Sequence, residues 1–262
     1  MPSNNFSLLF LGDVVGPLGR LAVKNYLAAN KFDFVIANGE NATHGHGLSY
    51  AHYQELLSYG VDAITSGNHF YNNKDAFDKN NDFGKEIRPL NLDPSTPLTG
   101  TNLFTARDGT KIRVSNVMGR VFLAGAQSNP FYEMDKVIAE DKENILHIID
   151  FHAEATAEKR AMGEYLDGRV TAVIGTHTHV QTNDGKVLKK GTFFLTDAGM
   201  NGAYDSILGD EVEGSLKRTL TGLPAIFDVP RSGTYQVNGV VLSIDKDTDK
   251  VVSYKLVNET GE

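Results

Sequence analysis

Two histidines separated by a single residue stand just after an apolar run, where the chain reads VIGTHTHV from Val173 to Val180. An extended strand points residues i and i+2 to the same side, so the imidazoles of His177 and His179 would converge. Inside a core they would be two polar rings that each need hydrogen-bond partners. At the open end of a strand they could instead share an acid, a phosphate or a metal ion.

Four other apolar runs end in residues that could join such a site: Asp13, Glu40 with Asn41, Asn68 with His69, and His152. Each alone has a structural explanation, such as a helix N-cap for Asp13 or a turn for Asn68. Together they would meet at one edge of a parallel sheet, where leaving them buried and unpaired would cost several kcal/mol. Two cations that share a bridging carboxylate would satisfy such a set, so the pattern predicts a dinuclear metal site.

The elements that would position these residues alternate between strand and helix patterns, which is typical of a parallel sheet in an α/β protein. Strands are expected at 6–11, 32–37, 63–65, 144–151 and 170–174, and helices at about 19–29, 49–59 and 153–166. Residues 80–135 carry Pro89, Pro94 and Pro97, then short alternating segments at 111–117 and 121–124, which predict hairpins of a second, mixed or antiparallel sheet. The segments 192–197 and 239–256 return to a β-like alternation. We expect one α/β domain over residues 1–262, with two sheets.

Composition narrows the chemistry. The 262 residues include no cysteine, which excludes disulfides, thiolate nucleophiles and cysteine-ligated zinc and leaves nitrogen and oxygen ligands. The net charge of −8 argues against a long nucleic acid held by charge alone. The first residues carry no signal-peptide pattern and no apolar run reaches the length of a membrane span, so we expect a cytoplasmic protein without a membrane partner.

The motifs GDVVG (12–16), NGENATHGHGL (38–48), GNH (67–69), DFHAEATAEK (150–159) and GTHTHVQTND (175–184) resemble those of the calcineurin-like metallophosphoesterases. In order and spacing they are most similar to the YmdB-type bacterial phosphodiesterases, from about residue 8 to about residue 230. The resemblance implies a four-layer α/β/β/α sandwich with two mixed sheets and two transition-metal ions at the strand ends. We expect the two ions to be iron or manganese, with zinc as an alternative.

The same resemblance implies a role for each candidate residue. Asp13 and His179 would hold one ion, with Asn41 as a further candidate ligand. Asn68, His152 and His177 would hold the other, and Glu40 would bridge both. His69 would donate a proton to the leaving group as a metal-bridging hydroxide attacks phosphorus.

Two departures from the wider superfamily stand out. The usual Asp-x-His of the first motif reads Asp13-Val14-Val15, so one imidazole is missing and Asn41 or water would take its place. After GNH the chain continues Phe70-Tyr71-Asn72 rather than with a Trp-Asp pair, which leaves the wall on the substrate side undefined. The roles of His44, His46 and the segment Asp197–Asn201 stay open.

The predicted function is hydrolysis of a small phosphodiester, with 2′,3′-cyclic nucleotides as a candidate and phosphomonoesters as the alternative. A non-catalytic, metal-binding regulator that acts through a partner is a second alternative, because a fold and a site do not guarantee turnover. A nucleotide-binding enzyme without metal fits poorly, since LFLGDVVGPLGR lacks both G-x-G-x-x-G and the P-loop Lys-Ser/Thr. Base rates favour an even-numbered homo-oligomer.

Overall fold

The computed structural model describes residues 5–141, 145–225 and 228–262. The strands are β1 (Asn5–Val15), β2 (Phe34–Asn41), β3 (Ala63–Thr65), β4 (Glu86–Ile87), β5 (Thr101–Thr105), β6 (Lys111–Met118), β7 (Leu146–His152), β8 (Ala172–Thr176), β9 (Lys186–Val187), β10 (Phe193–Leu195), β11 (Met200–Ala203), β12 (Tyr235–Asp245) and β13 (Lys250–Gly261). The α-helices are α1 (Gly16–Ala29), α2 (Tyr50–Tyr59), α3 (Pro130–Glu140), α4 (Thr156–Leu166) and α5 (Val212–Thr221). Two short 3-10 helices span Phe70–Asn72 and Asp75–Phe77.

The strands form two mixed sheets. The first has the order β13-β12-β11-β1-β2-β3-β4, in which β11, β1, β2, β3 and β4 run parallel and β12 and β13 run antiparallel to their neighbours. The second has the order β5-β6-β7-β8-β10-β9, with a parallel centre of β6, β7, β8 and β10. In α/β proteins, ligands bind just beyond the carboxyl ends of the parallel strands. In this chain those ends belong to β1, β2 and β3 in the first sheet and to β7 and β8 in the second.

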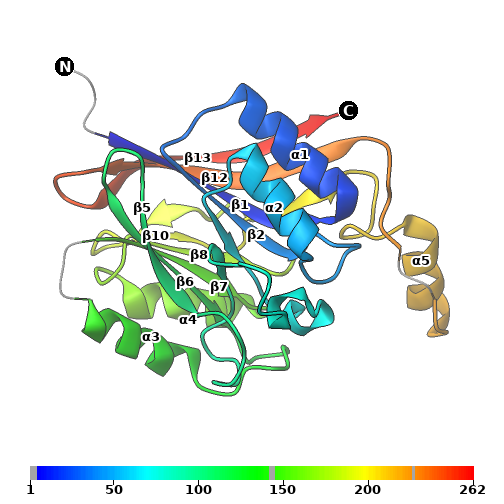
Figure 1. Cartoon of the computed structure of the whole chain (residues 1–262), viewed down its shortest axis with the longest axis horizontal. Coiled ribbons are helices and arrows are strands. Elements are labelled where there is room, and N and C mark those ends of the chain that lie inside the picture. The colour runs from blue at the N-terminus through cyan, green and yellow to red at the C-terminus, as the bar shows by residue number, and fades with distance from the viewer. Residues whose placement is uncertain (1–4, 142–144, 226–227) are drawn as a thin grey trace.

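The four layers follow from the two-residue alternation of the strands. In β1, Phe6, Leu8 and Phe10 point into the core between the two sheets. Leu9 and Leu11 point the other way, into the core beneath α1 and α2. A third core lies between the second sheet and the helices α3 and α4. Figure 1 shows α1 and α2 on one side of the sandwich and α3 and α4 on the other, which confirms the predicted α/β/β/α architecture.

Local signals explain where the first helices begin and end. Pro17 lies in the first turn of α1, where its missing N–H costs no hydrogen bond. The Ser49 side chain caps α2 by accepting from the backbone of His52, and Gly60 ends that helix in the left-handed conformation at φ 106°.

Most of the strands and helices predicted from sequence are present, within a few residues at their ends. The strand expected at 121–124 is wrong: that segment is irregular, and Phe122 is exposed with φ 60°. Two helices, α3 and α5, have no counterpart among the expected elements. Residue 144, the expected first residue of the fourth strand, lies outside the described residues, and β7 is described from Leu146. None of the helices in the described part of the chain has the length and apolar character that a membrane crossing requires.

One buried carboxyl on the edge strand β4 makes stability depend on pH. Glu86 is 5% exposed, its Oε2 has no hydrogen-bond partner, and burial raises the pKa of this carboxyl from 4.5 to about 8. The folded state therefore keeps a proton that the unfolded chain releases above pH 4.5, so this group's contribution to stability falls as pH rises from about 4.5 to 8.

We predict that Glu86→Gln removes this slope and raises the free energy of unfolding near pH 8.5 by roughly 1–4 kcal/mol relative to wild type, with little change at pH 4.5. Urea unfolding of both proteins across this range measures the difference, and the exposed Glu140→Gln is the control. Parallel curves for Glu86→Gln and wild type would contradict the prediction.

Candidate metal centre

The predicted residues come together, but from two sheets rather than from the edge of one. Asp13, Glu40 and Asn41 lie at the ends of β1 and β2, and Asn68 and His69 directly follow β3. His152 ends β7 in the other sheet, and His177 and His179 follow β8. The expectation of a single parallel edge is therefore corrected: the carboxyl ends of both sheets meet, and their side chains converge between them.

The two histidines of the VIGTHTHV motif do not lie on a strand, as their spacing suggested. β8 ends at Thr176, and His177 and His179 adopt φ values of 99° and 64°, which non-glycine residues rarely occupy. Backbone of this kind persists only where the surrounding structure imposes it, and it clusters at functional sites. The turn directs the two imidazoles to different partners instead of to the same side of a strand.

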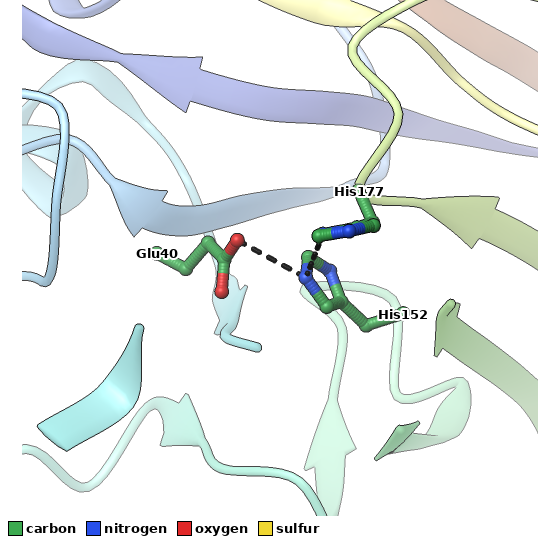
Figure 2. Close-up of side chains that lie close together, drawn as sticks. All are labelled: Glu40, His152 and His177. Carbon is green, nitrogen blue, oxygen red and sulfur yellow. Dashed lines mark hydrogen bonds and ion pairs between the residues drawn. The ribbon is translucent and has the colours of Figure 1, made fainter. Parts of the chain in front are cut away.

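Glu40 and His177 both point at the ring of His152 (Figure 2), and Asn68 also contacts it. The His152 Nε2 lies 3.0 Å from Glu40 Oε1, 3.0 Å from Asn68 Oδ1 and 3.1 Å from His177 Nδ1. A single N–H at Nε2 cannot serve three acceptors at once. Lone pairs that converge on one point are what a cation requires, and two imidazoles, a carboxylate and an amide oxygen suit a transition metal.

A second group lies on the other side of Glu40. The Asn41 side-chain nitrogen donates to Glu40 Oε1 over 3.3 Å and lies 3.1 Å from His179 Nε2, and Asp13 Oδ1 is 3.8 Å from the same His179 nitrogen. Asp13 Oδ1 and Asn41 Oδ1 are buried without a hydrogen-bond partner, which is costly unless a cation satisfies them. The side chains thus lie in two groups that both contact Glu40 Oε1, and the division of ligands between two ions stays a prediction.

Each histidine is held through its outer nitrogen, which fixes the inner nitrogen as the electron-pair donor. His179 Nδ1 is 2.7 Å from the carbonyl oxygen of Leu208. His177 Nε2 is 3.2 Å from a carboxylate oxygen of Glu154, and His152 Nδ1 is 2.9 Å from the hydroxyl of Thr176. With the proton on the outer nitrogen in each case, the lone pairs point to the centre, as metal binding needs.

The Thr176 hydroxyl belongs to a buried chain of hydrogen bonds that sequence analysis missed. It donates to Asp150 Oδ1 over 2.6 Å, so its own lone pair is left to accept from His152. The other oxygen of Asp150 accepts from Asn38 at 2.9 Å and from Thr65 at 2.5 Å. The two-residue spacing between Asp150 and His152 could have revealed this series of hydrogen bonds, because it places both side chains on the same face of one strand.

Electrostatics follow from this burial. For Glu40 burial alone would raise the pKa, but the adjacent His152 lowers it to about 2. Burial would lower the pKa of His152, but Glu40 and the other carboxylates raise it to about 9. Burial raises the pKa of Asp13 to about 6, against the attraction of His179. Burial and the charge of His152 lower the pKa of His177 to about 3, which keeps that imidazole neutral as a ligand must be.

Gly67 leaves the space that the donors need. A Cβ at this position would lie 2.1 Å from Glu40 Oε2 and 2.4 Å from His152 Nε2, so only glycine lets the chain pass. The backbone after it remains in contact with the centre, because the His69 N–H donates to Glu40 Oε2 over 3.2 Å. The residues around Glu40, His152 and His177 thus fit a divalent metal ion by donor type, orientation and space.

Several of the candidate ligands line a cavity of about 330 Å³, and His69 and His46 also line it. Their rings pack edge to face with centroids 4.6 Å apart, and burial lowers the pKa of His69. Val15 of the GDVVG motif also lines this cavity. His44 instead lies beside His52, 6.2 Å between ring centroids, so the two histidines of the glycine-rich loop have separate surroundings.

The segment Asp197–Asn201 lies behind the candidate ligands and forms hydrogen bonds with the turn that carries His177. Asp197 pairs with the fully buried Lys159 at 2.6 Å and accepts from the Thr178 backbone at 3.1 Å, while Lys159 also donates to the Thr176 carbonyl at 2.7 Å. Asn201 bonds the Gly12 carbonyl. This buried ion pair holds both ends of the turn that carries His177, so the role left open by the sequence is positional.

A four-layer α/β/β/α sandwich that gathers carboxylate, amide and imidazole donors where the carboxyl ends of both sheets meet defines a calcineurin-like metallophosphoesterase. Within that class the model of the YmdB-like proteins matches residues 9–257, and the chain belongs to this family.

Individual relatives agree over nearly the whole chain. A 2′,3′-cyclic-nucleotide 2′-phosphodiesterase of Bacillus subtilis (strain 168) is 46% identical over 259 residues, which are 96% of this chain and 97% of that protein. The crystal structure of a phosphatase from Mycoplasma pneumoniae has a TM-score of 0.90 at 37% identity, over 98% of this chain and 94% of that one. A hypothetical protein from Thermus thermophilus has a TM-score of 0.89 at 37% identity, over 98% and 100% of the two chains.

Removal of the Thr176 hydroxyl tests the outer hydrogen bonds. We predict that Thr176→Val lowers the affinity for Mn²⁺ about 10- to 100-fold, because His152 loses the acceptor that fixes its tautomer. Calorimetric titration of metal-free protein measures the affinity. Thr171→Val is the matched control, since this buried threonine accepts from the His147 backbone rather than from a donor of the centre. Equal affinities for Thr176→Val and wild type would contradict the role.

Proposed function

We propose that the protein is a metal-dependent phosphodiesterase that hydrolyses small phosphodiesters, with 2′,3′-cyclic nucleotides as the leading substrate class. The observation that carries the proposal is the convergence of side chains from the ends of β1, β2, β3, β7 and β8 on both sides of Glu40. The phosphodiesterase and phosphatase relatives support the coarser statement of phosphoester hydrolysis. The preference for diesters is supported by the charge of the residues that line the cavity.

In this proposal Asn68, His152 and His177 would hold one ion, Asp13, Asn41 and His179 the other, and Glu40 both. Bound ions of this kind activate water near neutral pH and neutralise phosphoryl oxygens. A set of nitrogen and oxygen donors without sulfur suits iron or manganese, with zinc as an alternative. The chain's own contribution is to hold the donors in place and to close the centre against bulk water on its inner side.

His69 would protonate the leaving alkoxide. Its backbone is tied to Glu40, and its ring forms part of the cavity wall instead of joining the donors around His152. The ring of His46, packed edge to face against it, limits its rotation. A positioned imidazole of this kind supplies a proton to the oxygen that departs.

The cavity favours an anion with one charge over an anion with two. Its lining contains no lysine or arginine in the described part of the chain, and it includes Glu154 and Asp210 in addition to the donor Glu40. A phosphodiester carries one negative charge, whereas a phosphomonoester carries up to two at neutral pH. Bound ions would offset the charge of Glu40, but Glu154 and Asp210 would stay uncompensated by any lysine or arginine among the described lining residues. Their charge disfavours a second negative charge on the ligand, which supports diesters as substrates.

Hydrolysis of bis-p-nitrophenyl phosphate by the Mn²⁺-loaded protein tests the proposed function. We expect release of p-nitrophenol that stops when a chelator is added and returns when excess Mn²⁺ restores the centre. Absence of release from this and several other phosphodiesters, with metal bound, would contradict the proposal.

Replacement of His69 separates proton donation from metal binding. His69→Ala should retain the metal content of wild type and lose about 10²–10⁴ in kcat on diesters with poor, alkoxide-like leaving groups. The loss should be much smaller with p-nitrophenolate, which leaves without a proton. Metal analysis and kinetics on both substrate types measure the two effects, and an equal loss on both would refute the acid role.

Replacement of Asp210 tests the charge argument. Asp210→Asn should raise kcat/KM for p-nitrophenyl phosphate relative to the diester about 3- to 30-fold, because one repulsive charge near the phosphate disappears. Asp205→Asn is the matched control, since Asp205 is exposed on the same segment but does not line the cavity. An unchanged ratio of the two substrates, in a variant that hydrolyses both, would refute the charge argument and leave the hydrolase proposal standing.

A further inference from the structure

A second cavity adjoins the cavity at the candidate metal centre. It has a volume of about 310 Å³, and His179 and Leu208 line both cavities. The contact between His179 Nδ1 and the Leu208 carbonyl oxygen, 2.7 Å long, therefore lies in the wall that the two cavities share. A ligand held at the metal centre would reach the second cavity across this one wall.

The two cavities differ in charge. Glu154 and Asp210 line the first, whereas the described lining of the second contains no aspartate, glutamate, lysine or arginine. A phosphate would meet no cation there, but a neutral ligand would meet hydrogen-bond donors and acceptors. The uncharged polar side chains that line the second cavity are those of Gln181, Tyr204, Ser206, Gln236, Asn238 and Asn258. We call it the amide cavity.

Contacts with the backbone fix the orientation of two of these amides. Gln181 Nε2 donates to the Val257 carbonyl oxygen over 2.8 Å. Asn238 Nδ2 donates to the Met200 carbonyl oxygen over 2.8 Å. A carbonyl oxygen only accepts, so neither amide can turn over without losing its bond. The oxygen of each amide is therefore the atom that remains for other partners.

These two oxygens orient Asn258 in turn. Its Nδ2 donates to Gln181 Oε1 at 3.2 Å and to Asn238 Oδ1 at 3.0 Å, so its own oxygen is left over. Asn258 Oδ1 and the side-chain amide of Gln236 have no hydrogen-bond partner among the residues that the structure describes. The amide cavity thus offers one acceptor of fixed orientation and, on the neighbouring strand β12, an amide with both a donor and an acceptor.

An aromatic ring is part of the same lining. Tyr204 is 54% exposed, and its hydroxyl has no hydrogen-bond partner within the described part of the chain. Proteins bind nucleobases by stacking them on exposed aromatic rings and by hydrogen bonds from amide side chains to the edges of the bases. The amide cavity combines these two features without a charged group.

We propose that the amide cavity binds the base of a nucleotide whose phosphodiester lies at the metal centre. Tyr204 stacks on the base, and Asn258 and Gln236 form hydrogen bonds with its edge. In a nucleoside 2′,3′-cyclic phosphate one ribose ring carries both the base and the phosphate, so the two groups are close enough to occupy adjoining cavities. This inference rests on the proposed function, because it places the phosphate of the same substrate at the metal centre.

Two cyclic diesters that differ in the base test the proposal by kinetics. Adenosine 2′,3′-cyclic phosphate carries a base, and glycerol 1,2-cyclic phosphate has the same five-membered cyclic diester without one. For the Mn²⁺-loaded wild type we expect kcat/KM to be at least about 30-fold higher for the nucleotide, mainly through a lower KM, because stacking and hydrogen bonds add to binding. A ratio near one, in a protein that hydrolyses both diesters, would overturn the inference and leave the phosphodiesterase proposal standing.

Replacement of lining residues tests which side chains hold the base. Tyr204→Ala should lower the nucleotide-to-glycerol ratio of kcat/KM about 5- to 100-fold, and Asn258→Ala about 5-fold. Tyr204→Phe keeps the ring and should retain most of the wild-type ratio. Ser253→Ala is the control, since Ser253 is exposed on β13 and lines neither cavity. Wild-type ratios for both alanine variants would overturn the inference.

A binding measurement keeps the test independent of turnover. Calorimetric titration of the Mn²⁺-loaded protein with adenosine 3′-monophosphate should show binding that Tyr204→Ala and Asn258→Ala weaken by similar factors. Absence of binding at millimolar nucleotide, or equal dissociation constants for wild type and both variants, would overturn the base site even in a protein that hydrolyses no diester. Thermal unfolding of each variant checks that the fold is retained.

Discussion

The rest of the site depends on one buried carboxylate, that of Glu40. It lies beside two groups of side chains, one with His152 and His177 and the other with His179. Glu40 is 1% exposed, and its carboxylate accepts from the Asn41 side chain and the His69 backbone and pairs with His152. A charge in that position is tolerable only with positive charge beside it. His152 supplies positive charge when its imidazole is protonated. Binding of a cation would displace that proton and would accept electron pairs from the other candidate ligands. The orphaned oxygens of Asp13 and Asn41 mark the same need on the second side.

The two packed sheets hold the candidate metal ligands close together. The carboxyl ends of the parallel strands in both sheets lie at the same end of the sandwich. The apolar core between the sheets sets the distance between the two sheets. Behind the donors, Asp150 and Thr176 orient His152, and the Lys159–Asp197 pair holds the turn of His177. These buried polar contacts satisfy one another, which gives a rigid setting for a strained turn. Substrate preference then depends on the exposed side, where Glu154 and Asp210 add negative charge at the mouth of the cavity.

Much of this was predictable from sequence because the signal repeats: an apolar run followed by a polar residue predicts a strand end, and several such ends predict a site. The two sheets could not be separated that way, since β3 and β7 have the same pattern although they lie in different sheets. The positive φ angles of His177 and His179 were hidden as well, because tertiary contacts impose them. Lys159 and Asp197 are 38 residues apart and were invisible as a pair. Helix α5 was missed because Gly214 and Thr219 in its interior weaken the helix signal.

The most direct test of the central claim is the location of metal in crystals of the Mn²⁺-loaded protein, measured by anomalous scattering at the manganese edge. The account predicts two peaks on opposite sides of Glu40, one within coordinating distance of His152 and His177 and the other near Asp13 and His179. A single peak, or peaks remote from Glu40 in a protein with full metal content, would contradict it.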